Sequence, residues 1–161
     1  MSRRPQITMS DQQVAALLAE ERIVICATNG RDGWPHLMPL WYVVRDGEVW
    51  SWTYAKSQKA RNLERDDRVT LQVETGDSYD QLRGVMIRAR VRIHRQTEDV
   101  AALGLEIYRR YTGGTSDDVK EMVAAQAPKR VALQFVAEGI ASWDHRKLGA
   151  PTDGAPSGGR P

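Results

Sequence analysis

The chain alternates apolar and polar residues most regularly between Gly84 and His94. A period of two residues is typical of a β-strand with one buried face. Other short runs are rich in β-branched or aromatic residues, and turn-forming residues separate most of them. We therefore predict strands over residues 23–28, 34–44, 48–53, 69–74, 84–94 and 130–136, with residues 140–143 extending the last strand.

A period near 3.6 residues marks the helices. Ser10 and Gln13 form a capping-box pattern ahead of apolar residues at helical spacing, which predicts a helix that begins at Asp11. Two more helices are expected over residues 97–110 and 117–126. Ser57 is placed to cap a short helix that holds residues 59–65.

Short strands separated by turns, with few helices, are typical of an antiparallel barrel. The expected fold class is therefore mainly β with minor α. We expect one folded domain over residues 10–148, preceded by a flexible N-terminus over residues 1–9. The tail over residues 149–161 is rich in Gly, Pro, Ser and Asp, which predicts disorder. No Gly-x-Gly-x-x-Gly follows a strand and no P-loop pattern is present, so neither usual nucleotide-binding loop is predicted.

Composition and charge narrow the classes of function. A net charge of +2 and a pI near 8.8 are too mild to predict a nucleic-acid-binding protein, although Arg88, Arg90 and Arg92 form a basic stripe on one strand.

The single cysteine, Cys26, lies in an apolar run, and no histidine pair has metal-ligand spacing, so no metal site is expected. No apolar run approaches the length of a membrane span, which predicts a cytoplasmic protein with no membrane partner.

The strand-to-helix junction at residues 53–61 has the chemistry of an anion site. A phosphate needs hydrogen-bond donors and positive charge in one place, and the first turn of a helix offers free backbone N–H groups. Two interpretations remain open on the residues alone. Either Ser57 only caps the helix while the basic side chains are solvated, or the segment binds a phosphate. The residues concerned are Lys56, Ser57, Lys59 and Arg61, and the hydroxyl of Thr53 adjoins them.

Aromatic residues precede this junction, where Trp50, Trp52 and Tyr54 alternate with hydroxyl side chains. Their rings could stack on an aromatic cofactor that carries a phosphate. The alternative is that the tryptophans fill the core or an interface, and for at least one of the two we expect this.

The strand over residues 34–44 contains Pro35 and Pro39, which cannot donate ladder hydrogen bonds. This predicts an edge or bulged strand, a position that often faces ligands. His36 lies in the same strand, but a lone histidine beside a turn is more often a packing or solvent-facing residue. No catalytic residue is therefore assigned.

Several short motifs are individually weak and specific in combination. They are Ala27-Thr28, Asp32-Gly-x-Pro35-His36, Pro39-x-Trp41-Tyr42, Thr53-x-x-Lys56-Ser57-x-Lys59-Ala-x-Asn62-Leu63, Leu82-Arg-Gly-Val85 and Ser142-Trp143-Asp144-His145-Arg-Lys147. Together they resemble the flavin-binding split-barrel superfamily, whose founding activity is pyridoxamine 5′-phosphate oxidase and which includes enzymes that use the deazaflavin coenzyme F420. The resemblance covers about residues 10–148. It implies a six-stranded antiparallel split β-barrel with peripheral helices, working as a homodimer with the cofactor site at the interface.

The resemblance also implies roles for individual residues. Phosphate contacts are implied for Thr53, Lys56, Ser57 and Lys59, and Arg61 or the basic stripe would meet the acidic tail of F420. The backbone of Met38, Pro39, Leu40 and Trp41 would run along the cofactor ring. Met38 stands where the oxidase branch has a phosphate-binding arginine, which argues against pyridoxamine phosphate as substrate and favours the deazaflavin branch.

The expected function is that of an oxidoreductase that transfers a hydride from reduced coenzyme F420 to an unsaturated or conjugated small molecule. The alternatives are an FMN-dependent oxidase or reductase on the same barrel, and a non-catalytic module that binds a flavin or haem. Nucleic-acid binding through the basic stripe is the least expected function.

Overall fold

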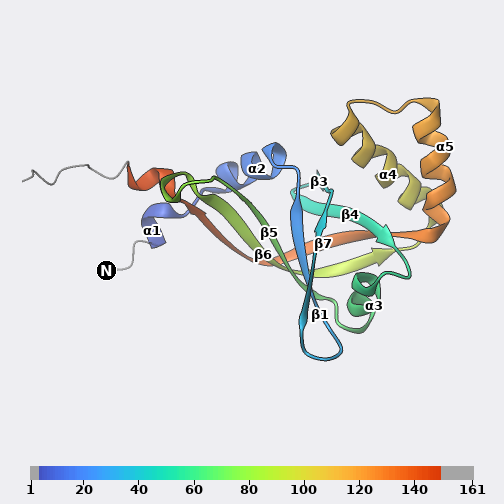
Figure 1. Cartoon of the computed structure of the whole chain (residues 1–161), viewed down its shortest axis with the longest axis horizontal. Coiled ribbons are helices and arrows are strands. Elements are labelled where there is room, and N and C mark those ends of the chain that lie inside the picture. Colours follow the sequence, from blue (N-terminus) through green and yellow to red (C-terminus); the bar gives the residue numbers. More distant parts are fainter. Residues whose placement is uncertain (1–3, 150–161) are drawn as a thin grey trace, which may run out of the picture.

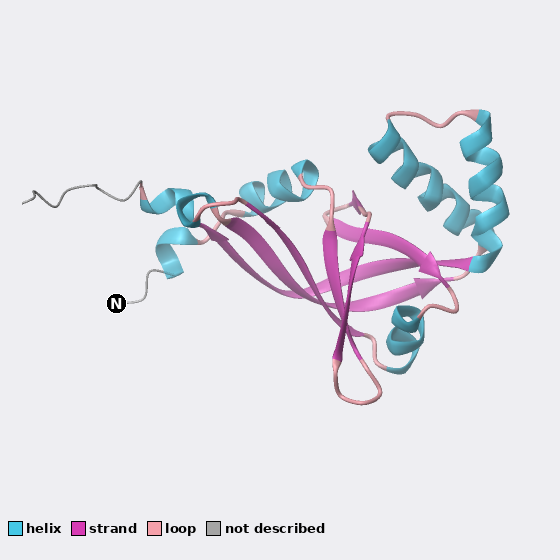
Figure 2. Cartoon of the chain, in the orientation of Figure 1, coloured by secondary structure: helices cyan, strands magenta, loops and turns pink. Residues whose placement is uncertain are grey.

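Seven antiparallel strands form one curled sheet in the computed structural model, which describes residues 4–149 (Figures 1 and 2). The strands are β1 (Val24–Asn29), β2 (Pro35–Leu40), β3 (Val43–Arg45), β4 (Glu48–Tyr54), β5 (Arg68–Thr75), β6 (Arg83–His94) and β7 (Arg130–Asp144). Their order across the sheet is β2-β1-β5-β6-β7-β4-β3. Because β2 and β3 are consecutive in the chain yet form the two edges, the sheet must curl back on itself.

Helices lie at both ends of the sheet, and α3 packs near β1 (Figure 1). They are α1 (Arg4–Ile7), α2 (Asp11–Glu20), α3 (Gln58–Arg65), α4 (Thr97–Thr112) and α5 (Asp117–Gln126), with short 3-10 turns η1 (Tyr79–Gln81), η2 (Ala127–Lys129) and η3 (His145–Leu148). The helices α4 and α5 form a pair at one end of the molecule, and α1 and η3 meet at the other. The capping box of α2 is formed as predicted, with Ser10 Oγ accepting from Gln13 N at 3.3 Å.

The mainly β, antiparallel split-barrel class with peripheral helices is confirmed, but the prediction of six strands was wrong. The segment over residues 34–44 is two strands, because Trp41 and Tyr42 leave the sheet between β2 and β3. Ser51 Oγ of β4 donates to the carbonyl of Trp41 at 2.7 Å and fixes this crossing. As expected from its prolines, β2 lies at an edge. The last strand runs without interruption to Asp144, with a register shift opposite Arg88 and Ala89.

The two ends of the described chain lie side by side. Lys147 Nζ donates to Thr8 O at 2.6 Å, and Met9 N donates to Ser142 Oγ at 3.0 Å. Met9 is buried within the core. Residues 1–9 were expected to be flexible, and the structure places residues 4–7 of this segment in α1. Of the tail expected over residues 149–161, all but Gly149 lies outside the described residues.

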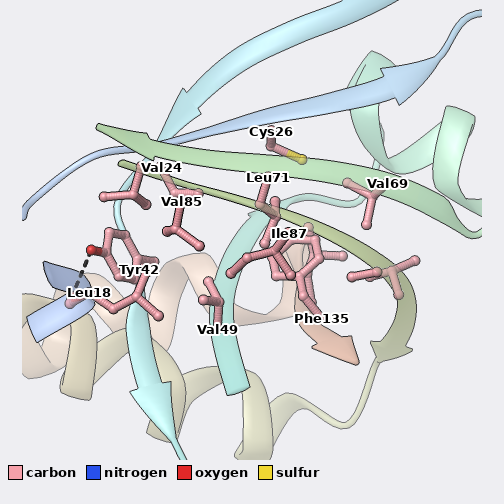
Figure 3. Packing of buried hydrophobic residues seen from close by; sticks show 14 of the residues in the cluster. Leu18, Val24, Cys26, Tyr42, Val49, Val69, Leu71, Val85, Ile87 and Phe135 are labelled. Atoms are coloured by element: carbon pink, nitrogen blue, oxygen red, sulfur yellow. Dashed lines mark hydrogen bonds between the residues drawn. The ribbon is translucent and has the colours of Figure 1, made fainter. Parts of the chain in front are cut away.

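The main core fills the inside of the curl (Figure 3). Apolar side chains of β1, β5, β6 and β7 meet those of α2 there, and Leu71 and Phe135 are almost fully buried. Tyr42 lies in the same core with its hydroxyl donating to Leu18 O at 2.7 Å. Each large apolar side chain buried in this way contributes about 1.5–3 kcal/mol. The crossing between β2 and β3 is therefore anchored from inside.

A second core lies between β4 and the α4–α5 pair. Trp52 is only 8% exposed there, and a Cβ on Gly104 of α4 would lie 2.6 Å from its ring, so glycine is needed for the contact. Trp50 faces the same side of β4, against His94 at 5.1 Å between ring centroids. The expectation that at least one of the two tryptophans fills the core is therefore confirmed for Trp52, and both rings point to the face of β4 opposite Thr53 rather than toward the predicted anion site.

One arginine links α4 to the end of α2 and to the crossing between β2 and β3. The guanidinium of Arg110, in the last turn of α4, donates to the carbonyls of Tyr42 at 2.6 Å, Leu18 at 2.9 Å and Glu21 at 2.7 Å. It also lies 4.4 Å from the ring centre of Tyr42. A single cation thus satisfies the carbonyl end of α2 and the crossing between the two edge strands.

We expect Arg110→Ala to lower the free energy of unfolding by about 2–4 kcal/mol, because several partly buried carbonyls lose a charged donor. The matched control is Arg109→Ala, since Arg109 is the neighbouring exposed arginine of the same helix. Its substitution should cost less than about 0.5 kcal/mol. Urea denaturation followed by tryptophan fluorescence measures both, and equal losses in the two variants would contradict the assigned role of Arg110.

Candidate anion-binding site

The junction between β4 and α3 brings three of the predicted phosphate residues together. Ser57 caps α3 as predicted, with its Oγ accepting from Ala60 N at 3.2 Å. The Oγ1 of Thr53 lies 3.3 Å from Ser57 Oγ and accepts from Lys59 Nζ at 2.9 Å. Two hydroxyls, one ammonium and the open end of a helix therefore converge at one place, which we call the Thr53–Ser57–Lys59 cluster.

The charge of Lys59 is buried without a matching anion. Its side chain is only 4% exposed, and within residues 4–149 no carboxylate lies within 4.0 Å of its Nζ. Burial lowers the pKa of Lys59, and the positive charge of Arg130 lowers that pKa further, against an opposing effect of Cys26. A buried ammonium that has only a hydroxyl partner is electrostatically unsatisfied. Binding of an anion would supply the missing charge.

The floor beneath the cluster is formed by β1. Cys26 is fully buried, and burial raises the pKa of its thiol to about 12, so this cysteine is an inert packing residue as expected. Asn62 of α3 is also fully buried, and its Nδ2 donates to Thr28 Oγ1 at 3.0 Å. Gln58 Nε2 donates in turn to Asn62 Oδ1 at 2.9 Å. These amide contacts fix α3, and with it Lys59, on the sheet.

Sequence reasoning missed Arg130. This residue begins β7 directly opposite Tyr54 in the ladder, and its guanidinium lies 4.0 Å from the ring centre of Tyr54 and 4.2 Å from that of Trp52. Its Nε donates to Gln126 Oε1 at 2.9 Å. Its guanidinium thus lies on the face of β4 opposite Thr53, and its positive charge nevertheless helps to lower the pKa of Lys59. The basic pair Lys129-Arg130 at the start of a predicted strand was the sequence signal that could have pointed to this residue. No neighbouring residue in the sequence indicated that this strand pairs with β4.

Lys56 and Arg61 are not part of the cluster in this structure. Both side chains are exposed, and neither forms an ion pair with any residue in the described range 4–149. They lie on the turn and on the outer face of α3, where they could contact a ligand only beyond the buried cluster.

The four residues expected along a cofactor ring separate into different environments. Met38 is 44% exposed and pairs across the ladder with Cys26, so it faces the side of the sheet that α3 covers. Leu40 faces the same way and packs against the main core, while Pro39 faces the opposite side. Trp41 stacks on Tyr111 of α4 with ring centroids 4.5 Å apart. Met38, Pro39 and Leu40 belong to the edge strand β2, and Trp41 follows where the chain leaves the sheet.

Two hollows flank this part of the sheet. A cavity of about 460 Å³ lies between the β1–β2 turn and α3, and it is lined by Trp34, His36, Gln58 and Asn62 among others. A larger hollow of about 790 Å³ includes Arg88 in its lining. Arg90, the next residue of the predicted basic stripe, is neutralised by Asp67 at 2.6 Å and Glu138 at 2.8 Å. The stripe is therefore only partly free to bind anions.

The donor set of the cluster fits a phosphate group better than a metal. Hydroxyls, an ammonium and helix N–H groups are all hydrogen-bond donors, which is what a phosphate oxygen requires. Across residues 4–149, no group of three or more His, Cys, Asp or Glu side chains could hold a metal ion. No helix in the described chain is long and apolar enough to span a membrane.

Residues 10–144 match the protein family described as pyridoxamine 5′-phosphate oxidase. Because the match covers most of the chain, the protein belongs to this family and to the flavin-binding split-barrel superfamily around it. No curated protein gives a significant match.

Solved structures agree with this assignment. The chain is 44% identical to the conserved hypothetical protein Rv2991 from Mycobacterium tuberculosis, with a TM-score of 0.86, over 99% of this chain and 98% of that one. It is 22% identical to an F420 reductase, with a TM-score of 0.65, over 78% of this chain and 94% of that one. It is 18% identical to an FAD-binding protein from Mesorhizobium loti, with a TM-score of 0.61, over 84% and 94% of the two chains. At such low identity, the last two show similarity of fold alone.

We expect Lys59→Met to raise the free energy of unfolding of the ligand-free protein by about 1 kcal/mol near neutral pH, because it removes a buried charge and keeps the volume. Since the folded-state pKa of Lys59 is lowered, the wild type should regain stability relative to the variant as the pH rises from that lowered value toward 10.5. Urea denaturation over this pH window measures the effect.

The control is Lys56→Met, which makes the same chemical change at an exposed position and should alter stability by less than about 0.5 kcal/mol. A clear loss of stability in Lys59→Met would mean that Thr53 alone satisfies the ammonium, and that Lys59 has a structural role.

Proposed function

We propose that this protein is an oxidoreductase that binds a phosphate-bearing flavin-type cofactor at the Thr53–Ser57–Lys59 cluster, with coenzyme F420 as the preferred cofactor. The observation that carries the proposal is the buried ammonium of Lys59, which has a hydroxyl partner and no anion among the described residues. A phosphate at this position would accept from Lys59, from both hydroxyls and from the first turn of α3.

Two observations favour F420 over FMN. Met38 occupies the position at which the oxidase branch of the superfamily is expected to carry a phosphate-binding arginine. The similarity to an F420 reductase also supports a deazaflavin as the cofactor of this protein. The similarity to the FAD-binding protein from Mesorhizobium loti supports a flavin instead. An FMN-dependent oxidase or reductase is therefore the second candidate.

When bound, the reduced cofactor would supply a hydride for an unsaturated or conjugated small molecule. The chain itself would bind and orient the cofactor. Lys59, Ser57 and Thr53 would hold the phosphate, while the backbone from Met38 to Trp41 would support the ring. Lys56 and Arg61, both exposed and without an ion pair in the described range, would meet the acidic tail of F420. The cytoplasm is the compartment we propose, because such a cofactor must be reduced again after each turnover.

A homodimer would complete the site. The first edge of the sheet exposes large apolar side chains, with Trp34 77%, Leu37 56% and Met38 44% exposed. Apolar surface of this kind on an edge strand is typical of an interface. We propose that a second copy covers it and contributes residues to the cofactor groove.

The proposal is tested by titrating the purified protein with oxidised F420 and, in parallel, with FMN while following ligand fluorescence. We expect a dissociation constant for F420 well below 1 mM, which corresponds to about −4 kcal/mol, and weaker binding of FMN. Lys59→Met should weaken binding by about 10-fold to 100-fold, because it removes a charged hydrogen bond to the phosphate.

Lys56→Met is the matched control and should change the affinity by less than about fivefold, as expected for an exposed charge. Tighter binding of FMN would favour the second candidate, and failure of both ligands to bind in the submillimolar range would remove the cofactor proposal.

A further inference from the structure

Within residues 4–149, two buried side-chain nitrogens have no hydrogen-bond partner, His36 Nδ1 and Trp50 Nε1. Leaving such an atom unpaired is unfavourable, so each one needs an explanation. The ring of Trp50 is enclosed by other side chains, with His94 stacked on it and the guanidinium of Arg45 5.1 Å from the ring centre. His36 is different, because a cavity lies beside it.

His36 faces the same side of the sheet as the Thr53–Ser57–Lys59 cluster. It pairs across the ladder with Thr28, and residues paired in this way share one face. The hydroxyl of Thr28 accepts from Asn62 of α3. The next pair on this face, Cys26 and Met38, includes the thiol that influences the pKa of Lys59. The imidazole and the buried ammonium thus lie under the same helix.

The cavity beside His36 has a volume of about 460 Å³, which is large enough for part of an organic ligand. Gln58 and Asn62, from the first two turns of α3, form its wall together with His36, and Trp34 contributes an exposed ring. A ligand whose anionic group reaches the N-terminal turn of α3 could therefore extend into this cavity.

We propose that His36 is a further ligand-binding residue, whose Nδ1 forms a hydrogen bond with a polar atom of the ligand held at the Thr53–Ser57–Lys59 cluster. The inference rests on the proposed function, and it adds a residue that the cluster itself does not contain. It explains why this buried nitrogen beside a cavity has no hydrogen-bond partner among the described residues. It also predicts that the Nδ1 atom, and not the Nε2 atom, makes the contact.

This distinction allows a sharp test by substitution. The amide of Asn places a polar atom close to the position of Nδ1, the amide of Gln reaches the position of Nε2, and Leu has neither. For oxidised F420, and for FMN in parallel, we expect His36→Leu and His36→Gln to weaken binding at least about fivefold, the equivalent of one hydrogen bond. His36→Asn should bind within about twofold of the wild type.

Nuclear magnetic resonance of the wild-type protein gives an independent readout that needs no folded variant. With ¹⁵N-labelled histidine, the Nδ1 signal of His36 should shift when F420 is added, since a new hydrogen bond forms at that atom. His145 is the internal control, because its Nδ1 already lies 2.9 Å from Tyr79 O at the far end of the sheet.

The outcomes separate the two proposals. Wild-type protein that binds neither cofactor contradicts the proposed function and this inference with it. Wild-type protein that binds, with His36→Leu and His36→Gln binding equally well or with an unmoved His36 signal, contradicts this inference alone.

Discussion

The burial of one ammonium group, that of Lys59, is the constraint around which this end of the molecule is arranged. An ammonium taken out of water is costly unless an opposite charge or several acceptors compensate, and here Thr53 is its hydrogen-bond partner among the described side chains. The sheet and α3 keep it in place because Asn62 anchors the helix to Thr28. The fold therefore keeps a buried positive charge that has no opposite charge beside it among the described residues, and this is the basis of the proposed anion site.

The rest of the architecture holds this junction rigid. The curl of the sheet places β4 beside β7, and the crossing at Trp41 and Tyr42 joins the two edges. Arg110 and Tyr42 bind that crossing to α2 and α4, so the edge strand β2 and the cluster on β4 keep a fixed relation. Burial raises the pKa of the Tyr42 phenol, which keeps it a neutral donor.

Local chemistry explains what could be predicted from the sequence. The alternation in β6, the capping box at Ser10 and the cap at Ser57 are short-range signals, and all three correspond to elements of the structure. Contacts between segments far apart in the chain could not be predicted from the sequence. The face to which Trp52 points is decided by the close approach of Gly104, some fifty residues away. The effect of Arg130 on the pKa of Lys59 and the unpaired nitrogen of His36 likewise depend on how separate segments meet.

The central claim is that Lys59 is a buried cation whose charge is neutralised by binding an anionic ligand. The most direct measurement is the pKa of Lys59, followed by nuclear magnetic resonance of ¹³C-labelled lysine in the free protein and in the presence of saturating F420. The account predicts a pKa below the usual 10.5 in the free protein and a rise on binding, since a phosphate stabilises the charged form. A pKa that is normal in the free protein, or unchanged when ligand is bound, would contradict it.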